Sequence, residues 1–134
     1  MRTLPLLVLV FACGGGSAAP DAHMDVSPPT LQWASCPVIT GGTDAAAACG
    51  EADVPLDWTR PDGPRIHLFV KRIGSVDAPA QMWMLNGGPG ASGADFDPVA
   101  QQLTADGSLV IYLPDHRGTG RSTRLGCAAE DDAS

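Results

Sequence analysis

Basic residues are scarce in this sequence. Lys and Arg together number 8 among 134 residues, against 15 Asp and Glu, and the formal net charge is −7. A nucleic-acid-binding surface needs Lys and Arg grouped on one face, and here they are scattered along the chain. The composition therefore excludes nucleic acid as a partner, and the acidic excess favours solubility.

Long apolar runs are also missing. A membrane-spanning helix needs roughly 20 apolar residues, whereas the apolar stretch at residues 4–12 is short and ends at Cys13. Because it follows Arg2, this stretch predicts an export signal over residues 1–13. Its end resembles the lipobox of bacterial lipoproteins, which implies a lipid anchor on Cys13, in the cell envelope. The alternative is an ordinary signal peptide of a secreted protein, cut nearby.

Residues 14–32 contain almost nothing to bury, since Gly, Ser, Ala, Pro and Asp predominate, and they predict a flexible linker. Cysteine is scarce, with four residues in all. In an exported protein, Cys36 and Cys49 are expected to form a disulfide, which closes a ring worth about 3 kcal/mol. Cys127 then remains, either as a free thiol or with a partner outside this sequence.

Residues 33–134 predict a single folded unit. Residues 54–58 alternate as a half-buried edge strand does, residues 59–64 have the composition of a turn, and residues 65–73 predict a second strand with one buried face. Together they predict a β-hairpin. The buried face of the second strand is expected to carry Ile66, Leu68 and Val70.

The second half of the chain predicts a parallel pair of strands. Residues 81–85 and 108–113 are nearly continuous apolar runs, which indicate strands covered on both faces. Between them, Asp97 is expected to cap a helix that begins at Pro98 and ends near Gly107. A hairpin followed by this βαβ unit predicts an α/β fold with a mostly parallel sheet. The fold is expected to be incomplete, because one helix covers only part of one face.

One run of residues predicts chemistry. Asn86, Gly87, Gly88, Pro89 and Gly90 follow the first apolar strand and precede the helix. Glycines at such a place allow backbone N–H groups to approach a ligand without a Cβ in the way. This suits an oxyanion hole, in which each donor stabilises the tetrahedral intermediate by about 3 kcal/mol.

The sequence resembles the N-terminal third of the secreted tripeptidyl and prolyl aminopeptidases, which have the α/β-hydrolase fold. The resemblance covers residues 33–127 and rests on Trp33 with Cys36, on residues 54–57, and on the glycine-rich runs at 86–90 and 115–122. In that family the first run commonly opens with His, where this chain has Asn86.

The resemblance implies an exported serine peptidase that cleaves a peptide, amide or ester through an acyl-enzyme, with no metal or cofactor. Gly88 or its neighbour would supply one oxyanion donor. The second run, with Asp115, Arg117, Gly118, Gly120 and Ser122, would brace the site, Asp115 and Arg117 through charge-assisted hydrogen bonds.

The nucleophile is missing from these 134 residues, because no Gly-x-Ser-x-Gly motif occurs in them. Ser92 lies in the nearest match, residues 90–94, which does not have the glycines in the required places. The order serine, acid, histidine in this fold predicts a triad beyond Ser134, in a longer enzyme. His23, His67 and His116 are accordingly interpreted as surface or structural residues.

Two alternatives remain. Residues 88–93 also satisfy the dinucleotide-binding pattern G-x-G-x-x-G, with Asp115 as the following acid. Against that, the third glycine is expected to stay in the loop, Asp115 leads into a second glycine-rich run, and export separates the protein from cytosolic cofactors. The other alternative is a catalytically inactive surface lipoprotein that retains part of the hydrolase scaffold.

Overall fold

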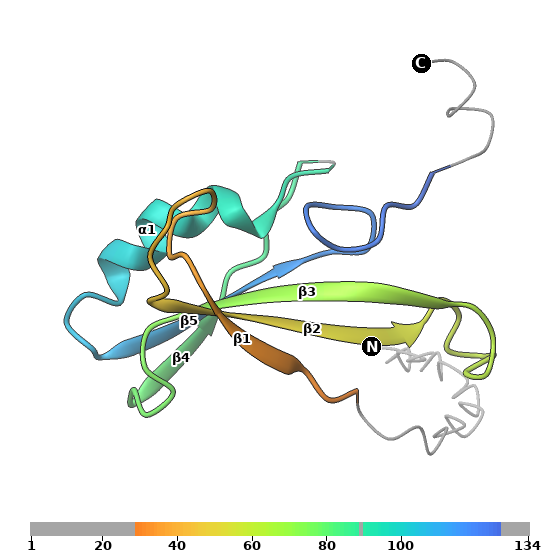
Figure 1. The fold of residues 1–134 in the computed structure, drawn as a ribbon, viewed down its shortest axis with the longest axis horizontal. Helices are drawn as coiled ribbons and strands as arrows, with labels where there is room; N and C mark the ends of the chain where they lie inside the picture. Colours follow the sequence, from red (N-terminus) through yellow and green to blue (C-terminus); the bar gives the residue numbers. More distant parts are fainter. Residues whose placement is uncertain (1–28, 89, 127–134) are drawn as a thin grey trace, which may run out of the picture.

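A computed structural model describes residues 29–88 and 90–126 (Figure 1). The described part of the chain forms five strands, a 3₁₀ helix and a short α-helix. In chain order these are β1 (Gln32–Cys36), β2 (Ala47–Pro55), β3 (Arg65–Ile73), β4 (Ala80–Trp83), η1 (Gly93–Phe96), α1 (Asp97–Leu103) and β5 (Leu109–Asp115).

The strands form one sheet in the order β1-β2-β3-β5-β4, and three of the four neighbouring pairs are antiparallel. Only β4 and β5 run parallel. The expected α/β fold with a mostly parallel sheet is therefore wrong: the chain forms a small, mostly-β domain with one short α-helix. The physical reason lies in the connections, because residues 56–64 join β2 to β3 as a hairpin and β5 then pairs antiparallel with β3.

The hairpin lies where the sequence predicts it, but β2 is longer than expected. It begins at Ala47 and first pairs with β1, so its first half is an interior strand. The pairing with β1 stops at Glu51, which leaves Pro55 on a stretch whose outer side is unpaired. That is where a residue without an N–H is tolerated.

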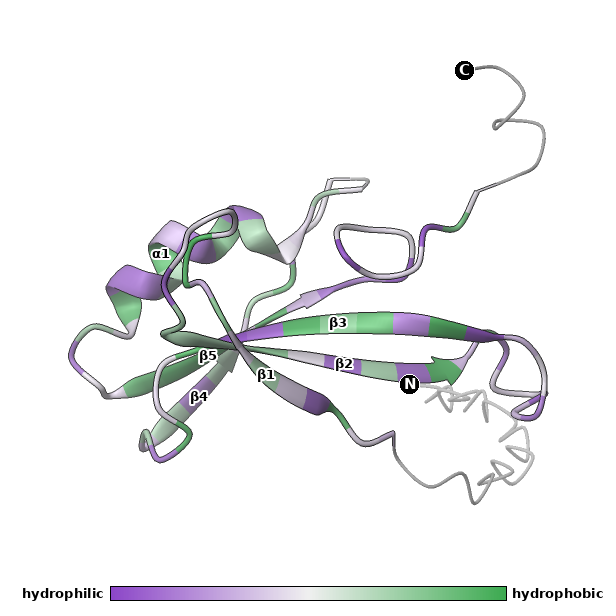
Figure 2. Ribbon diagram, viewed as in Figure 1, coloured by the Kyte–Doolittle hydropathy of each residue, from purple (hydrophilic) through white to green (hydrophobic). Residues whose placement is uncertain are grey.

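Burial of β3 departs from the prediction. Ile66 and Val70 are buried as expected, whereas Leu68 is only partly buried. Phe69, Lys71 and Ile73 on the other face are buried too. Figure 2 shows apolar residues along much of β3. Both faces are covered here because α1 and the chain between β1 and β2 pack on the side that the sequence predicted to be open.

Strand β4 is exposed, which contradicts its predicted burial on both faces. It lies at the edge of the sheet, all four of its residues are exposed, and Trp83 retains 50% of its surface. Trp83 stacks on Tyr112 of β5, with ring centroids 4.6 Å apart. The apolar run therefore predicted a strand correctly, but it did not predict that this strand lies at the edge of the sheet. No described element covers that edge, so β4 stays exposed.

Helix α1 begins at Asp97 and is preceded by η1, whose N-cap is Ser92. Asp97 does not cap the helix as predicted, because its carboxylate accepts hydrogen bonds from Lys71 and Thr40 instead. Gly107, at φ +76°, donates to Thr104 and ends the helical region. The core between α1 and the sheet consists of Val38, Ala47, Ile73, Ala100, Ile111 and Leu113.

Cys36 and Cys49 form the expected disulfide, which joins β1 to β2. Cys13, Cys127, the predicted export signal and most of the predicted linker lie outside the described residues. In the part of the chain that the structure describes, no helix has the length and apolar character needed to cross a membrane.

Candidate functional site

Two glycine-rich segments meet at one end of the sheet. We define the first glycine loop as residues 86–92, after β4, and the second glycine loop as residues 116–122, after β5. Because β4 and β5 are parallel neighbours, both loops begin at the same edge, and Figure 1 shows them rising on the same side. The sequence predicted this meeting, since the carboxyl ends of parallel strands lie together.

The first glycine loop is held at its base and open at its tip. The Asn86 side-chain amide donates to the Ser92 carbonyl at 2.7 Å and to the Asp95 carboxylate at 2.9 Å. Gly88 and Gly90 have φ values of +57° and +89°, which favour glycine.

Among the described residues, and apart from the chain neighbours, no heavy atom lies within 4 Å of the position that a Cβ would occupy on Gly87, Gly88 or Gly90, and all three residues are exposed. Pro89, the fifth residue predicted here, lies outside the described residues. The backbone at the tip therefore faces open space.

Asp115 joins the two loops. One carboxylate oxygen accepts from the Ser92 hydroxyl at 2.9 Å and from the Gly93 N–H at 2.7 Å, and the other accepts from the Arg121 N–H at 2.8 Å. The residue is only 4% exposed. Its charge is thus used internally, to fix the positions of both loops.

Two glycines lie where a side chain would collide with the end of β5. Gly93 lies against the backbone of Leu113 and Pro114, where a Cβ would come within 3.0 Å of the Pro114 carbonyl. Gly120 has a φ of +50°, and a Cβ there would overlap the Asp115 carboxylate. The Asp115 carboxylate therefore requires glycine at position 120, and the backbone at the end of β5 restricts position 93.

Ser122 anchors the second glycine loop to the sheet. Its buried hydroxyl donates to the Asp115 carbonyl at 2.8 Å and accepts from the Phe69 N–H at 3.0 Å. Thr123 continues the attachment through its N–H, which donates to the His67 carbonyl. Gly118, at φ +85°, donates to the Thr123 carbonyl and closes the loop.

Arg117 lies apart from this network. Its guanidinium donates to the Leu56 carbonyl at 2.9 Å, in the connection between β2 and β3. Arg121 is the basic residue that approaches the site: its backbone N–H binds Asp115, and its guanidinium lies 4.1 Å from the centroid of the Phe69 ring. Sequence reasoning missed this contact, because Arg121 makes it with its backbone N–H, while its guanidinium stays exposed at the surface, 3.4 Å from Glu51.

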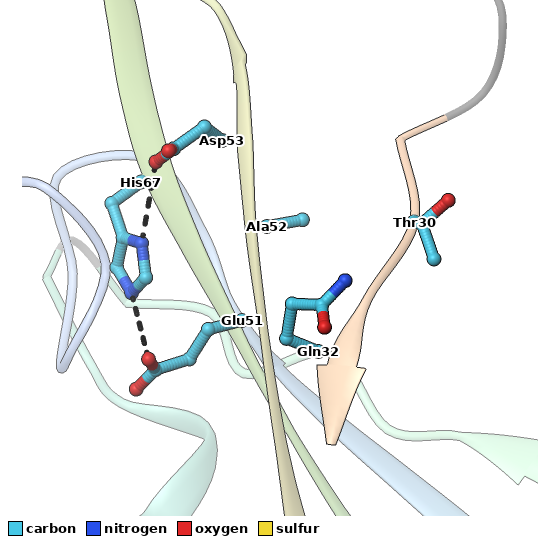
Figure 3. A pocket seen from close by; sticks show the side chains of 6 residues that line it. All are labelled: Thr30, Gln32, Glu51, Ala52, Asp53 and His67. Atoms are coloured by element: carbon cyan, nitrogen blue, oxygen red, sulfur yellow. Dashed lines mark ion pairs between the residues drawn. The ribbon is translucent and has the colours of Figure 1, made fainter.

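A surface pocket of about 360 Å³ lies further along β2 and β3 (Figure 3). Nε2 of His67 is 3.8 Å from Glu51, and Nδ1 is 3.5 Å from Asp53. Figure 3 shows these three side chains on one side of β2 and Thr30 and Gln32 on the other. The side chains do not converge on one point, and no set of three possible metal ligands occurs in the described ranges.

Ser92 is not placed to act as the nucleophile of a serine hydrolase. Its hydroxyl donates to Asp115 and accepts from the Ala94 N–H at 3.1 Å, so it serves as the cap of η1. The described residues at this site thus provide a braced backbone turn and no activated hydroxyl.

Comparison with protein-family models finds no match for this chain, and comparison with curated proteins finds none either.

Proposed function

We propose that this chain provides the oxyanion-binding loop of an exported serine hydrolase, of the aminopeptidase type, that cleaves peptide or amide bonds through an acyl-enzyme. The observation that carries the proposal is the first glycine loop. Its Gly87, Gly88 and Gly90 are exposed and sterically open, while its base is tied by Asn86 and Asp115.

The chemistry requires such a rigid and open turn. When a serine attacks a carbonyl carbon, the carbonyl oxygen becomes negative, and N–H groups that already point at it stabilise the charge without reorganisation. One donor comes from the first glycine loop, and the second comes from the residue after the nucleophile. The hydrogen bonds from Gly93 and Ser92 to Asp115 fix the end of the loop, and the Ala91 N–H donates to the Gly88 carbonyl at 3.3 Å within it.

The serine itself has to come from outside the printed sequence, since Ser92 is used as a cap and no Gly-x-Ser-x-Gly motif is present. The disulfide between Cys36 and Cys49 supports export, because such bonds persist outside the reducing cytosol. A lipid anchor on Cys13 is part of the proposal and concerns a residue that the structure does not describe.

Dinucleotide binding is less well supported. Gly93 packs closely on β5, as the third glycine of that pattern does, so the expectation that it stays free in the loop is wrong. However, the acid that would bind the ribose, Asp115, is buried and already accepts three hydrogen bonds. A ribose hydroxyl would have to displace donors that hold both loops together.

The proposal is tested on the protein made from its complete reading frame, with a fluorophosphonate probe and fluorogenic aminopeptidase substrates. We expect the probe on a serine within a Gly-x-Ser-x-Gly motif outside residues 1–134, and turnover that is lost when this serine becomes Ala. Residues 1–134 alone are expected to give no turnover above background. A folded protein with neither labelling nor turnover would contradict the proposal and support the inactive lipoprotein.

The role of the first glycine loop is tested by a matched pair of variants in that protein. Gly88→Ala forces an L residue to a φ of +57° and displaces the adjoining amide, so kcat is expected to fall by about 10²-fold. The matched control, Gly107→Ala, adds the same methyl group at a φ of +76° outside the loop, where no described residue is near, and kcat is expected to stay unchanged. Equal effects of the two changes would show that this loop supplies no donor.

A further inference from the structure

Lys71 is the only lysine in the chain, and it is buried. Its ammonium group uses all three of its donors: it binds the Asp97 carboxylate at 2.7 Å, the Thr40 hydroxyl at 2.7 Å and the Val38 carbonyl at 3.2 Å. The side chains of Lys71 and Asp97 are 4% and 2% exposed. All of the hydrogen bonds to Asp97 are accepted by its Oδ2 atom, and its Oδ1 atom is buried without a partner among the described residues. The cost of burying the two charges is therefore offset only by the ion pair itself and by the remaining hydrogen bonds of Oδ2 and of the ammonium group.

Those remaining bonds come from one segment. We define the disulfide loop as residues 37–46, which connect β1 to β2. Besides binding Lys71, the Thr40 residue of this loop donates to Asp97 from its N–H at 2.8 Å and from its hydroxyl at 2.6 Å. Figure 1 shows the disulfide loop lying against α1, the helix that begins with Asp97. The disulfide loop therefore acts as the cover of the ion pair.

Apart from the disulfide near its ends, the cover is held by Val38 in the core, by the hydrogen bonds of Thr40 to the ion pair, and by Asp44, which accepts from two N–H groups of the same loop. Residues 39–46 are exposed, and only Val38 enters the core. The strand that leads into it, β1, is also largely exposed and pairs along five residues of β2. Cys36 is partly buried, at the surface end of the bridge. The disulfide closes residues 36–49 into a ring, and it therefore opposes any movement of the disulfide loop away from the sheet.

We propose that the Cys36–Cys49 disulfide is a redox-sensitive clamp, which keeps the disulfide loop closed over Lys71 and releases it on reduction. In that step an external dithiol reductant gives up two electrons and two protons and becomes a disulfide. The bond between the sulfurs of Cys36 and Cys49 breaks, and both residues become thiols. When the loop moves, Thr40 leaves the ion pair, so that Lys71 becomes exposed to solvent. Asp97, the first residue of α1, then loses its hydrogen bonds from Thr40. This inference does not rest on the proposed hydrolase activity.

The test uses the complete chain and the reactivity of its amines. The oxidised protein and a sample reduced with dithiothreitol, desalted without oxygen, are each given a short pulse of acetyl N-hydroxysuccinimide ester, and mass spectrometry quantifies acetylation at Lys71. The α-amine at the N-terminus is the internal reference. We expect reduction to raise the Lys71 rate by roughly a hundredfold, the factor to which the entropy of this ring corresponds. An unchanged Lys71 rate would overturn the proposal.

Variants separate the clamp from general unfolding. Cys36→Ser with Cys49→Ser is expected to show the fast Lys71 rate without reductant and no further response to it. Thr40→Val keeps the disulfide but removes the hydroxyl, so it is expected to raise the rate about tenfold. Thr43→Val, on the same loop but exposed and without a hydrogen bond to the pair, is the matched control and is expected to change nothing.

Hydrogen exchange on the reduced protein completes the test. Amides of β3 that pair with β2 are expected to stay protected, while those of the disulfide loop exchange freely. Loss of protection throughout β3 would show that the disulfide holds the whole domain together, and the proposal of a local clamp would then be wrong.

Discussion

The carboxylate of Asp115 accepts a hydrogen bond from the Gly93 N–H at 2.7 Å, and through this contact the end of β5 fixes the segment that follows the first glycine loop. The same carboxylate holds Arg121 of the second glycine loop. Two motifs that are more than twenty residues apart in the sequence are therefore one structural unit, organised around a buried acid.

Replacement of Asp115 tests this unit. Asp115→Ala leaves the donors of Ser92, Gly93 and Arg121 without an acceptor, so the free energy of unfolding is expected to fall by about 3 kcal/mol. Asp115→Asn retains one oxygen acceptor and is expected to lose less. Urea denaturation measures both variants, and an alanine variant as stable as the natural protein would contradict the assignment.

Gly120 is expected to tolerate no side chain. Gly120→Ala places a methyl group on the Asp115 carboxylate at a φ of +50°, so strain and overlap together are expected to cost about 3 kcal/mol. Gly107→Ala is the control, since Gly107 has a φ of +76° but no neighbour within 4 Å. Its loss is expected to be only the backbone cost of about 1 kcal/mol. Thermal unfolding of the two variants gives the comparison.

The buried ion pair is expected to be far more sensitive to loss of one partner than of both. Lys71→Met leaves the Asp97 charge buried, and the expected loss of stability is about 3–5 kcal/mol. The double change of Lys71→Met with Asp97→Leu removes both charges and is expected to recover much of that loss. If the single and double variants unfold at the same urea concentration, then neither charge offsets the cost of burying the other, and the prediction is wrong.

The Asp44 carboxylate is expected to make a contribution to folding stability that depends on pH. The Val38 N–H, and after it the Ala46 N–H, hold the pKa of Asp44 below its ordinary value of 3.8, because both stabilise the carboxylate. A lowered pKa in the folded state means that the contribution is present above pH 3.8 and is lost as the pH falls through the folded pKa.

Comparison of the natural protein with Asp44→Asn measures that contribution. The natural protein is expected to be the more stable of the two near neutral pH, and its advantage in urea midpoint is expected to shrink as the pH falls below 3.8. A constant difference between pH 7 and pH 2 would show that the carboxylate charge makes no contribution.

Local patterns predicted those features that depend on neighbouring residues. The turn at residues 59–64 indicated the hairpin, two apolar runs indicated strands, and two cysteines that bracket a loop indicated the disulfide. Burial of β4 was predicted wrongly, because an apolar run does not reveal whether its strand ends at the edge of the sheet. The parallel sheet was predicted wrongly for a similar reason, since the place of β5 beside β3 is a long-range choice.

The candidate site divides along the same line. The glycine motifs were identifiable from the sequence, because turns with positive φ favour glycine. Asp115 was identifiable with them, because a carboxylate next to such turns is expected to accept hydrogen bonds from their N–H groups. The sequence did not show that a backbone N–H, that of Arg121, binds Asp115 while the Arg117 guanidinium binds the Leu56 carbonyl. Nor did it show that Lys71 meets Asp97 and Thr40. Those contacts bring together residues from different elements of the fold.

Taken alone, the amino-acid sequence determined the turn before β3, the segments that extend as β3, β4 and β5, and the residues that carry reactive groups, because these follow from the dihedral preferences and side-chain chemistry of consecutive residues. It indicated neither β1 nor the first half of β2. Only the tertiary structure decided which strand lies at the edge, which face is covered and which charges are paired. These depend on the pairing order of strands and on the burial of charge, and both are set by free energies shared among residues distant in the chain.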